Sequence, residues 1–172
     1  AVEEGRAIFA NIRRFVKFSI AGNIGKIIVM LVAPLFGITV ALLPLQLLWL
    51  NLLTDGLLGL GLGLEAAEPT TMQQQPRSPK AGFFAGGLLV HIAWVGALIG
   101  FAALGLGIYY FERTAGQGNL WQTMMFTSLA FMQIGQALAS RSARLSLFSM
   151  GVRSNYVIFI MIFLVAGLQL AA

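Results

Sequence analysis

Two charged side chains, Lys26 and Asp55, lie within stretches of the chain that are otherwise apolar enough to cross a lipid bilayer. A charge at the centre of the hydrocarbon costs at least ~2.5 to 3.5 kcal/mol on insertion scales, so it needs a partner, a water-filled cavity or an ion. Carboxylate, amide and hydroxyl oxygens are the ligands that hard cations such as Ca²⁺, Mg²⁺ and Na⁺ accept. The sequence therefore predicts an intramembrane cation site, with Lys26 and Asp55 beside four further polar side chains: Asn23, Asn51, Thr54 and Gln133.

The positions of these residues along their helices predict that they meet at one depth. Lys26 lies ~12 Å into its apolar run from one side of the membrane, and Asp55 lies ~20 Å into the next run from the other side, at about 1.5 Å per residue. In a hydrocarbon core ~30 Å thick both fall slightly to the same side of the midplane, and Gln133 falls at a similar level. We expect Lys26 and Asp55 to face each other across neighbouring helices.

The composition excludes an ordinary soluble protein and indicates a membrane protein. Of the 172 residues, 58% are hydrophobic and only 10% are charged, and the mean hydropathy is +0.85. The apolar runs lack the alternation of a barrel strand, and a helix is then the only spanning structure that pairs its own backbone in lipid. We predict an all-α, polytopic membrane helical bundle of five transmembrane helices, at about residues 11–35, 42–64, 83–111, 120–139 and 154–172.

Basic residues set the expected orientation of the bundle. They cluster before the first run, between the second and third, and between the fourth and fifth, and only Arg113 falls on the opposite side. The positive-inside rule then places the amino end in the cytoplasm. Membrane topology therefore explains the net charge of +5. We expect the chain to contact lipid and not to bind nucleic acid. Residues 3–17 predict a cytoplasmic stalk that extends the first helix.

Glycines come soon after Asp55 in the second run and allow two interpretations. Clustered glycines weaken a helix by up to ~1 kcal/mol each, and local unwinding would offer backbone carbonyls to an ion. Glycine is also common in membrane helices simply because it lets helices pack closely. Because the glycines begin at the acidic residue, we expect unwinding beside Asp55.

Two carboxylates, Glu65 and Glu68, lie just after the second run at its expected cytoplasmic end. They could form an entrance for ions, but exposed carboxylates beside Arg77 and Lys80 are usually solvated. We therefore leave both residues out of the predicted site.

Four segments resemble one protein family. Residues 45–57 (LQLLWLNLLTDGL) and the later segment 76–80 (PRSPK) resemble the sixth transmembrane helix and next loop of P-type cation-transporting ATPases, the calcium-pump branch in particular. Residues 3–8 (EEGRAI) and 23–25 (NIG) resemble the stalk and fifth helix of that family. The resemblance implies that residues 1–172 are the carboxyl-terminal transmembrane region, helices five to nine, cut from a longer pump. It also implies that ATP and Mg²⁺ act only through domains that lie elsewhere, so we expect no ATP hydrolysis by these residues alone.

The resemblance implies two adjacent ion seats. Asn51 and Asp55 match one seat, while Asn23, Thr54 and Asp55 match a second seat that also takes carboxylates from two helices. Here those two carboxylate positions hold Lys26 and Gln133. A divalent ion ~4 Å from an ammonium is repelled by several kcal/mol at an effective dielectric near 20. We expect Lys26 either to occupy the second seat as a built-in cation or to form a permanent structural bridge with Asp55.

Two functions compete at this point. The first is transport of a cation, Ca²⁺ by resemblance, by the ion-binding half of an ATP-driven pump, whose partners are the amino-terminal helices and cytoplasmic domains of the same protein. The second is a free-standing, non-enzymatic ion channel or proton-coupled carrier that uses Lys26 and Asp55 as a relay. The small loops suit a bacterial inner membrane.

Overall fold

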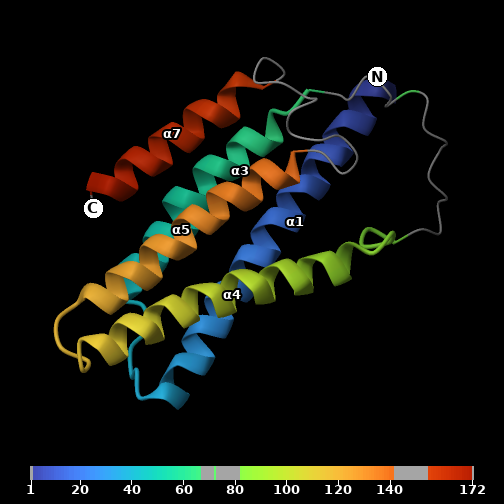
Figure 1. Ribbon diagram of the computed structural model, residues 1–172. Helices are drawn as coiled ribbons and strands as arrows, with labels where there is room; N and C mark the ends of the chain where they lie inside the picture. The colour runs from blue at the N-terminus through green and yellow to red at the C-terminus, as the bar shows by residue number, and fades with distance from the viewer. Residues whose placement is uncertain (1, 67–71, 73–81, 142–154, 172) are drawn as a thin grey trace.

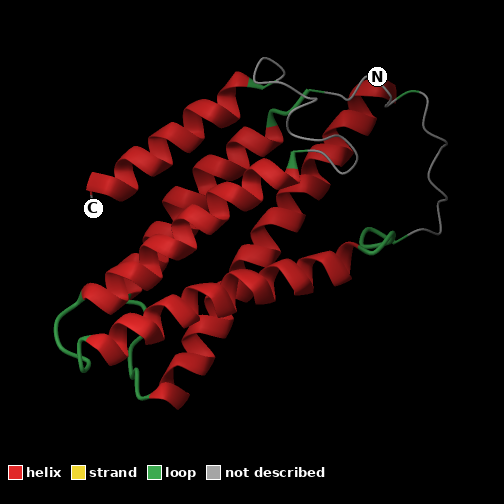
Figure 2. Ribbon diagram, viewed as in Figure 1, coloured by secondary structure: helices red, strands yellow, loops and turns green. Residues whose placement is uncertain are grey.

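The computed structural model describes residues 2–66, 72, 82–141 and 155–171, and within these ranges the secondary structure is entirely helical (Figure 2). The predicted all-α fold is therefore confirmed. The elements are α1 (Val2–Val32), the 3₁₀ turn η1 (Ala33–Phe36), α2 (Pro44–Leu48), the π-helical segment η2 (Trp49–Thr54), α3 (Asp55–Gly63), α4 (Leu88–Arg113), α5 (Leu120–Ser140) and α7 (Tyr156–Ala171).

Three stretches of helix are long and apolar enough to cross a membrane, judged by length and composition within the described residues: Val2–Phe36, Pro44–Gly63 and Leu88–Arg113. The apolar helix α7 is shorter, at 16 residues. Helix α5 has 21 residues, and several of its polar side chains, including Gln122, Gln133 and Gln136, are buried inside the bundle. A helix that turns its polar groups toward other helices keeps them away from lipid, as a membrane bundle requires.

Helix α1 contributes to the packing of three other helices. It packs against α3, α4 and α5, and Figure 1 shows α4 crossing it. Glycines make this crossing close, since a Cβ built on Gly96 would lie 2.9 Å from the carbonyl oxygen of Ala21, and one on Gly100 would lie 2.9 Å from that of Gly25. Small residues at such contacts let two backbones approach, which is how helices associate in membranes.

Apolar packing falls into two main clusters. One joins α1, the η1 region, η2, α4 and α5 around Val29, Leu50 and Met125, and the other joins α1, α3, α5 and α7 around Phe18 and Leu58. Lys26 lies on α1 between Phe18 and Val29 in sequence and is itself buried. The polar site is thus enclosed along α1 by apolar packing on both sides.

The glycines after Asp55 do not unwind the helix, so that prediction was wrong. Helix α3 is regular through Gly63, and the irregular segment η2 lies before Asp55. A Cβ on Gly59 would lie 2.6 Å from Phe15 Cε2, and one on Gly61 would lie 2.9 Å from Ile158 Cα. These two glycines therefore allow α1 and α7 to pack closely on α3, which is the alternative that the sequence left open.

Candidate cation site

Lys26 and Asp55 meet across the interface between α1 and α3. The Lys26 ammonium Nζ lies 2.6 Å from Asp55 Oδ2 and donates a second hydrogen bond to Asn51 Oδ1, also at 2.6 Å. Lys26 is 3% exposed and Asp55 7%. The prediction that these two charges face each other is confirmed. Charge-assisted hydrogen bonds at this distance are among the strongest that a protein makes.

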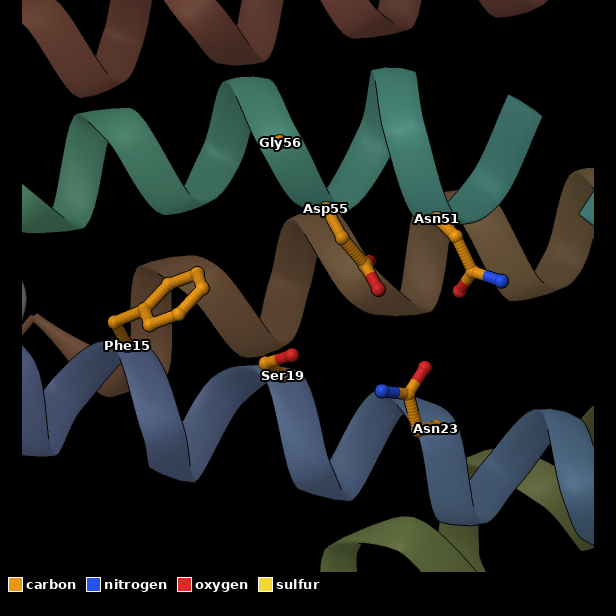
Figure 3. Close-up of a pocket in the computed structure, with 6 residues that line it drawn as sticks. All are labelled: Phe15, Ser19, Asn23, Asn51, Asp55 and Gly56. Carbon is orange, nitrogen blue, oxygen red and sulfur yellow. The ribbon is translucent and has the colours of Figure 1, made fainter. Parts of the chain in front are cut away.

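The irregular backbone of η2 positions the two residues that hold Lys26. Asn51 lies within η2, and Asp55 is the first residue of α3. In a π-helical segment the hydrogen bonds run from residue i to i+5, so the turn is wider than in an α-helix. Both side chains nevertheless point from this helix toward α1, as Figure 3 shows. π-Helical turns occur often at functional sites.

A cavity of about 250 Å³ adjoins the ion pair, and most of the residues around it are polar. Its lining residues are Phe15, Ser19, Asn23, Asn51, Asp55 and Gly56. Figure 3 shows Asn51 and Asp55 projecting from one helix toward Ser19 and Asn23 on α1. Asn23 and Asn51 are exposed, so the cavity opens to the surface of this bundle.

The cavity carries the oxygen atoms that a hard cation needs. Asp55 uses Oδ2 to hold Lys26, and its other carboxylate oxygen, Oδ1, is buried and has no hydrogen-bond partner among the residues that the structure describes. Amide and hydroxyl oxygens of Asn23, Asn51 and Ser19 lie around the same cavity. Among the described residues no three His, Cys, Asp or Glu side chains come together. A cation here would therefore depend on one carboxylate supplemented by neutral oxygens.

Ser19 lines the cavity although it was not among the residues predicted from the sequence. It lies four residues before Asn23 on α1, the spacing that puts two side chains on one face of a helix. That spacing could have identified it, but Ser19 lies near the start of the apolar run and well before Lys26.

Thr54 and Gln133 lie apart from the cavity lining. Both are fully buried, and neither the Thr54 hydroxyl nor the two amide atoms of Gln133 has a hydrogen-bond partner within the described structure. The Gln133 amide packs on Gly22, where an added Cβ would lie 2.8 Å from Nε2. Because Gly22 precedes Asn23, Gln133 does lie at the depth that the sequence predicted. The structure therefore brings Asn23, Asn51 and Asp55 to one cavity, and Thr54 and Gln133 are not part of its lining.

Comparison with known proteins decides the family. Residues 39–172 match the family model described as "Cation transporting ATPase, C-terminus". The chain belongs to the cation-transporting ATPases.

Three relatives of this ATPase segment are between 34% and 39% identical to it over the aligned residues. It is 39% identical over 142 residues to a calcium-transporting ATPase of Bacillus subtilis, covering 83% of the chain and 16% of the relative. It is 37% identical over 139 residues to a probable calcium-transporting ATPase of Trypanosoma brucei brucei, covering 80% and 14%. It is 34% identical over 175 residues to calcium-transporting ATPase 1 of Bacillus cereus, covering 92% and 20%. The chain thus spans a fifth or less of the length of each of these three relatives.

Glu65 of this ATPase segment is neither solvated nor part of an open entrance, so both interpretations offered for it were wrong. It is buried and accepts two hydrogen bonds from the Arg141 guanidinium, at 3.0 and 3.1 Å. The sequence could not reveal this contact, because each residue lies just beyond an apolar run, where a charge ordinarily meets water. Glu68, Arg77 and Lys80 lie outside the described residues.

Proposed function

We propose that this chain is the ion-binding part of an ATP-driven cation pump. Asp55 is the charged ligand of the transported cation, Asn51 and Asn23 are neutral ligands, and Thr54 and Gln133 supply further oxygens behind them. ATP and Mg²⁺ would act through parts of the pump outside these 172 residues. Helix α1 would link those parts to the site, because it is continuous from Val2 to Val32 and reaches Asp55 through Lys26.

One observation carries this proposal. A buried carboxylate borders a cavity that oxygen-bearing side chains line from two apolar helices, and one of its oxygen atoms has no hydrogen-bond partner in the described part of the chain. An ionised side chain at this depth is expensive and marks an ion pathway by default. Ca²⁺ is the first candidate for the cation, because it takes carboxylate, amide and hydroxyl oxygens and because the relatives are described as calcium-transporting.

Lys26 acts in this proposal as a tethered cation. Its ammonium donates to Asn51 Oδ1 and Asp55 Oδ2 and so takes the place of a second metal ion, while Asp55 Oδ1 and the second lone pair of Asn51 Oδ1 stay available to the transported cation. A second divalent ion beside the ammonium would be strongly repelled. The competing role is a permanent bridge that only holds α1 to α3. Reversing the charge of Lys26 separates the two roles, because only removal of a tethered cation would make room for a second metal ion.

The pump would lie in a bacterial inner membrane with the amino end of α1 in the cytoplasm. The amino-terminal part of α1, the end of α3 and the end of α5 lie toward the same end of the bundle (Figure 1). Among the described residues, this end carries four basic side chains of α1 and Arg141 after α5, whereas Arg113 ends α4, and the positive-inside rule assigns the more basic end to the cytoplasm. Lipid and the remaining parts of the pump would be its partners. The free-standing channel or carrier loses support because the chain belongs to the ATPase family.

Transport by the full-length protein in proteoliposomes tests the proposal. We expect Ca²⁺ to stimulate ATP hydrolysis and to enter the vesicles, and Asp55→Asn to abolish both, because the site then has no anion. Glu112→Gln is the matched control, since it removes an exposed carboxylate at the far end of α4 and should leave both activities unchanged. Full Ca²⁺ stimulation in Asp55→Asn would contradict the proposal.

A further inference from the structure

A second buried polar cluster lies at the opposite end of α3 from Asp55. We call it the Glu65 cluster, and it consists of Asn11, Glu65, Arg141 and Asn155. Arg141 is 1% exposed and Glu65 3%, so the ion pair is almost fully removed from solvent. Figure 1 shows the elements that meet there: the end of α3, the end of α5, the start of α7 and the amino-terminal part of α1.

The Glu65 carboxylate is held from two directions. The Arg141 guanidinium donates from Nε to Oε2 and from Nη2 to Oε1, which fixes the carboxylate plane. Asn155 Nδ2 donates to the same Oε2 at 2.9 Å and also to the Gly61 carbonyl at 2.9 Å. The side-chain oxygen of Asn155 accepts a hydrogen bond from the Ile158 amide, which ties the contact to the first turn of α7.

Asn11 attaches the same end of α3 to helix α1. Its side-chain amide donates to the Gly63 carbonyl at 3.0 Å and to the Glu65 carbonyl at 2.8 Å. These carbonyls lie at and just after the end of α3, where the last carbonyls of a helix have no backbone N–H partner within the helix. The terminus of α3 is thus bound to α1, α5 and α7 by side chains whose polar groups are paired.

The cluster can act on Asp55 because α3 is a rigid connection between them. From Asp55 to Gly63, two residues before Glu65, helix α3 rises about 12 Å at about 1.5 Å per residue. The helix is regular from Asp55 to Gly63, and its irregular part, η2, lies on the far side of Asp55. A rotation or shift of the Glu65 end would therefore move the Asp55 carboxylate relative to Lys26 on α1.

We propose that the Glu65 cluster is a positioning site that sets the cation affinity of the Asp55 site without touching the cation. Arg141 and Asn155 fix the rotation of α3 about its axis, and Asn11 fixes its distance from α1. This inference rests on the proposed function, because it concerns the affinity of that same site. A cluster that only stabilised the fold would change thermal stability and leave the affinity alone.

The test is the Ca²⁺ concentration for half-maximal ATP hydrolysis by the full-length pump, measured with the maximal rate and the melting temperature. We expect Asn11→Ala and Arg141→Lys to raise that concentration by roughly 2- to 30-fold, the range for mutations that couple distant sites, with a smaller change in maximal rate. Arg141→Lys keeps the charge but loses the two-point contact, and Arg141→Gln should have the larger effect. Gln122→Leu is the control, because it removes a buried amide near the opposite end of α5.

The possible failures are distinguishable. If the wild-type pump shows no Ca²⁺-stimulated hydrolysis, the proposed function fails. If the wild type is stimulated and Asn11→Ala keeps the wild-type half-maximal concentration, the positioning role fails, whatever happens to the melting temperature. Asn11→Ala leaves the Glu65–Arg141 pair intact and so decides the matter even if the Arg141 variants do not fold.

Discussion

At the residue scale, the pairing of Lys26 with Asp55 makes each charge dependent on the other. Removing one partner of a buried ion pair leaves the other uncompensated, which typically costs about 3 to 5 kcal/mol, whereas replacing both by apolar groups is often neutral. The 2.6 Å contact and the near-complete burial of both side chains place this pair in that class.

We therefore predict that Lys26→Met lowers the melting temperature of the detergent-solubilised pump in the absence of divalent cations. The double variant Lys26→Met with Asp55→Leu should recover most of the loss, because no charge then remains buried. Differential scanning fluorimetry of the wild type and the two variants checks this. Equal melting temperatures for Lys26→Met and the wild type would mean that the pair contributes nothing to stability.

Gln133 permits a different kind of test, since its two amide atoms have no partner in the described structure. Replacing a polar group that makes no hydrogen bond by an apolar group of similar size costs little stability. We predict that Gln133→Met leaves the melting temperature unchanged or slightly higher but weakens Ca²⁺ stimulation, because a ligand oxygen is lost. A fall in melting temperature with unaltered Ca²⁺ dependence would assign Gln133 to packing alone.

At the element scale, close contact between α1 and α4 depends on glycine. A Cβ on Gly96 would meet the Ala21 carbonyl oxygen at 2.9 Å and the Ile24 side chain at 2.7 Å, and backbone cannot move aside cheaply. We predict that Gly96→Ala destabilises the bundle by about 1 to 3 kcal/mol, the usual cost of overpacking. Gly105→Ala, in the same helix with nothing within 4 Å, should be tolerated. Equal stability of the two variants in thermal unfolding would contradict this contact.

Helices and the central ion pair could be predicted from the sequence, but not the contacts at helix ends. Apolar runs reveal helices because length and hydropathy decide what can lie in a membrane. The helical rise per residue is enough to predict that Lys26 and Asp55 lie at the same depth in the membrane. The change to i→i+5 backbone hydrogen bonds in η2 cannot be read from the hydrophobic periodicity of the sequence. The burial of Glu65 and Arg141 depends on how four helices converge, which a linear pattern does not contain.

At the scale of the whole molecule, the proposed orientation can be tested by labelling, because the 172 residues contain no cysteine. In a pump freed of other cysteines, Glu3→Cys should react with a membrane-impermeant maleimide only from the cytoplasmic side. Gln117→Cys, in the exposed turn between α4 and α5, should react only from the outside. Labelling of intact cells and inverted vesicles distinguishes the two sides. Reaction of both residues from one side would contradict the proposed topology.

In the assembled pump, the ion stoichiometry depends on whether Lys26 takes the place of a second cation beside Asp55. Equilibrium binding of radiolabelled Ca²⁺ to the purified full-length protein measures this stoichiometry, with wild type and Lys26→Glu compared at saturation. We predict one bound ion per wild-type pump and two per Lys26→Glu pump, because the substitution removes the tethered charge and adds a carboxylate. The same number of bound ions with the same affinity in both proteins would contradict the tethered-cation role.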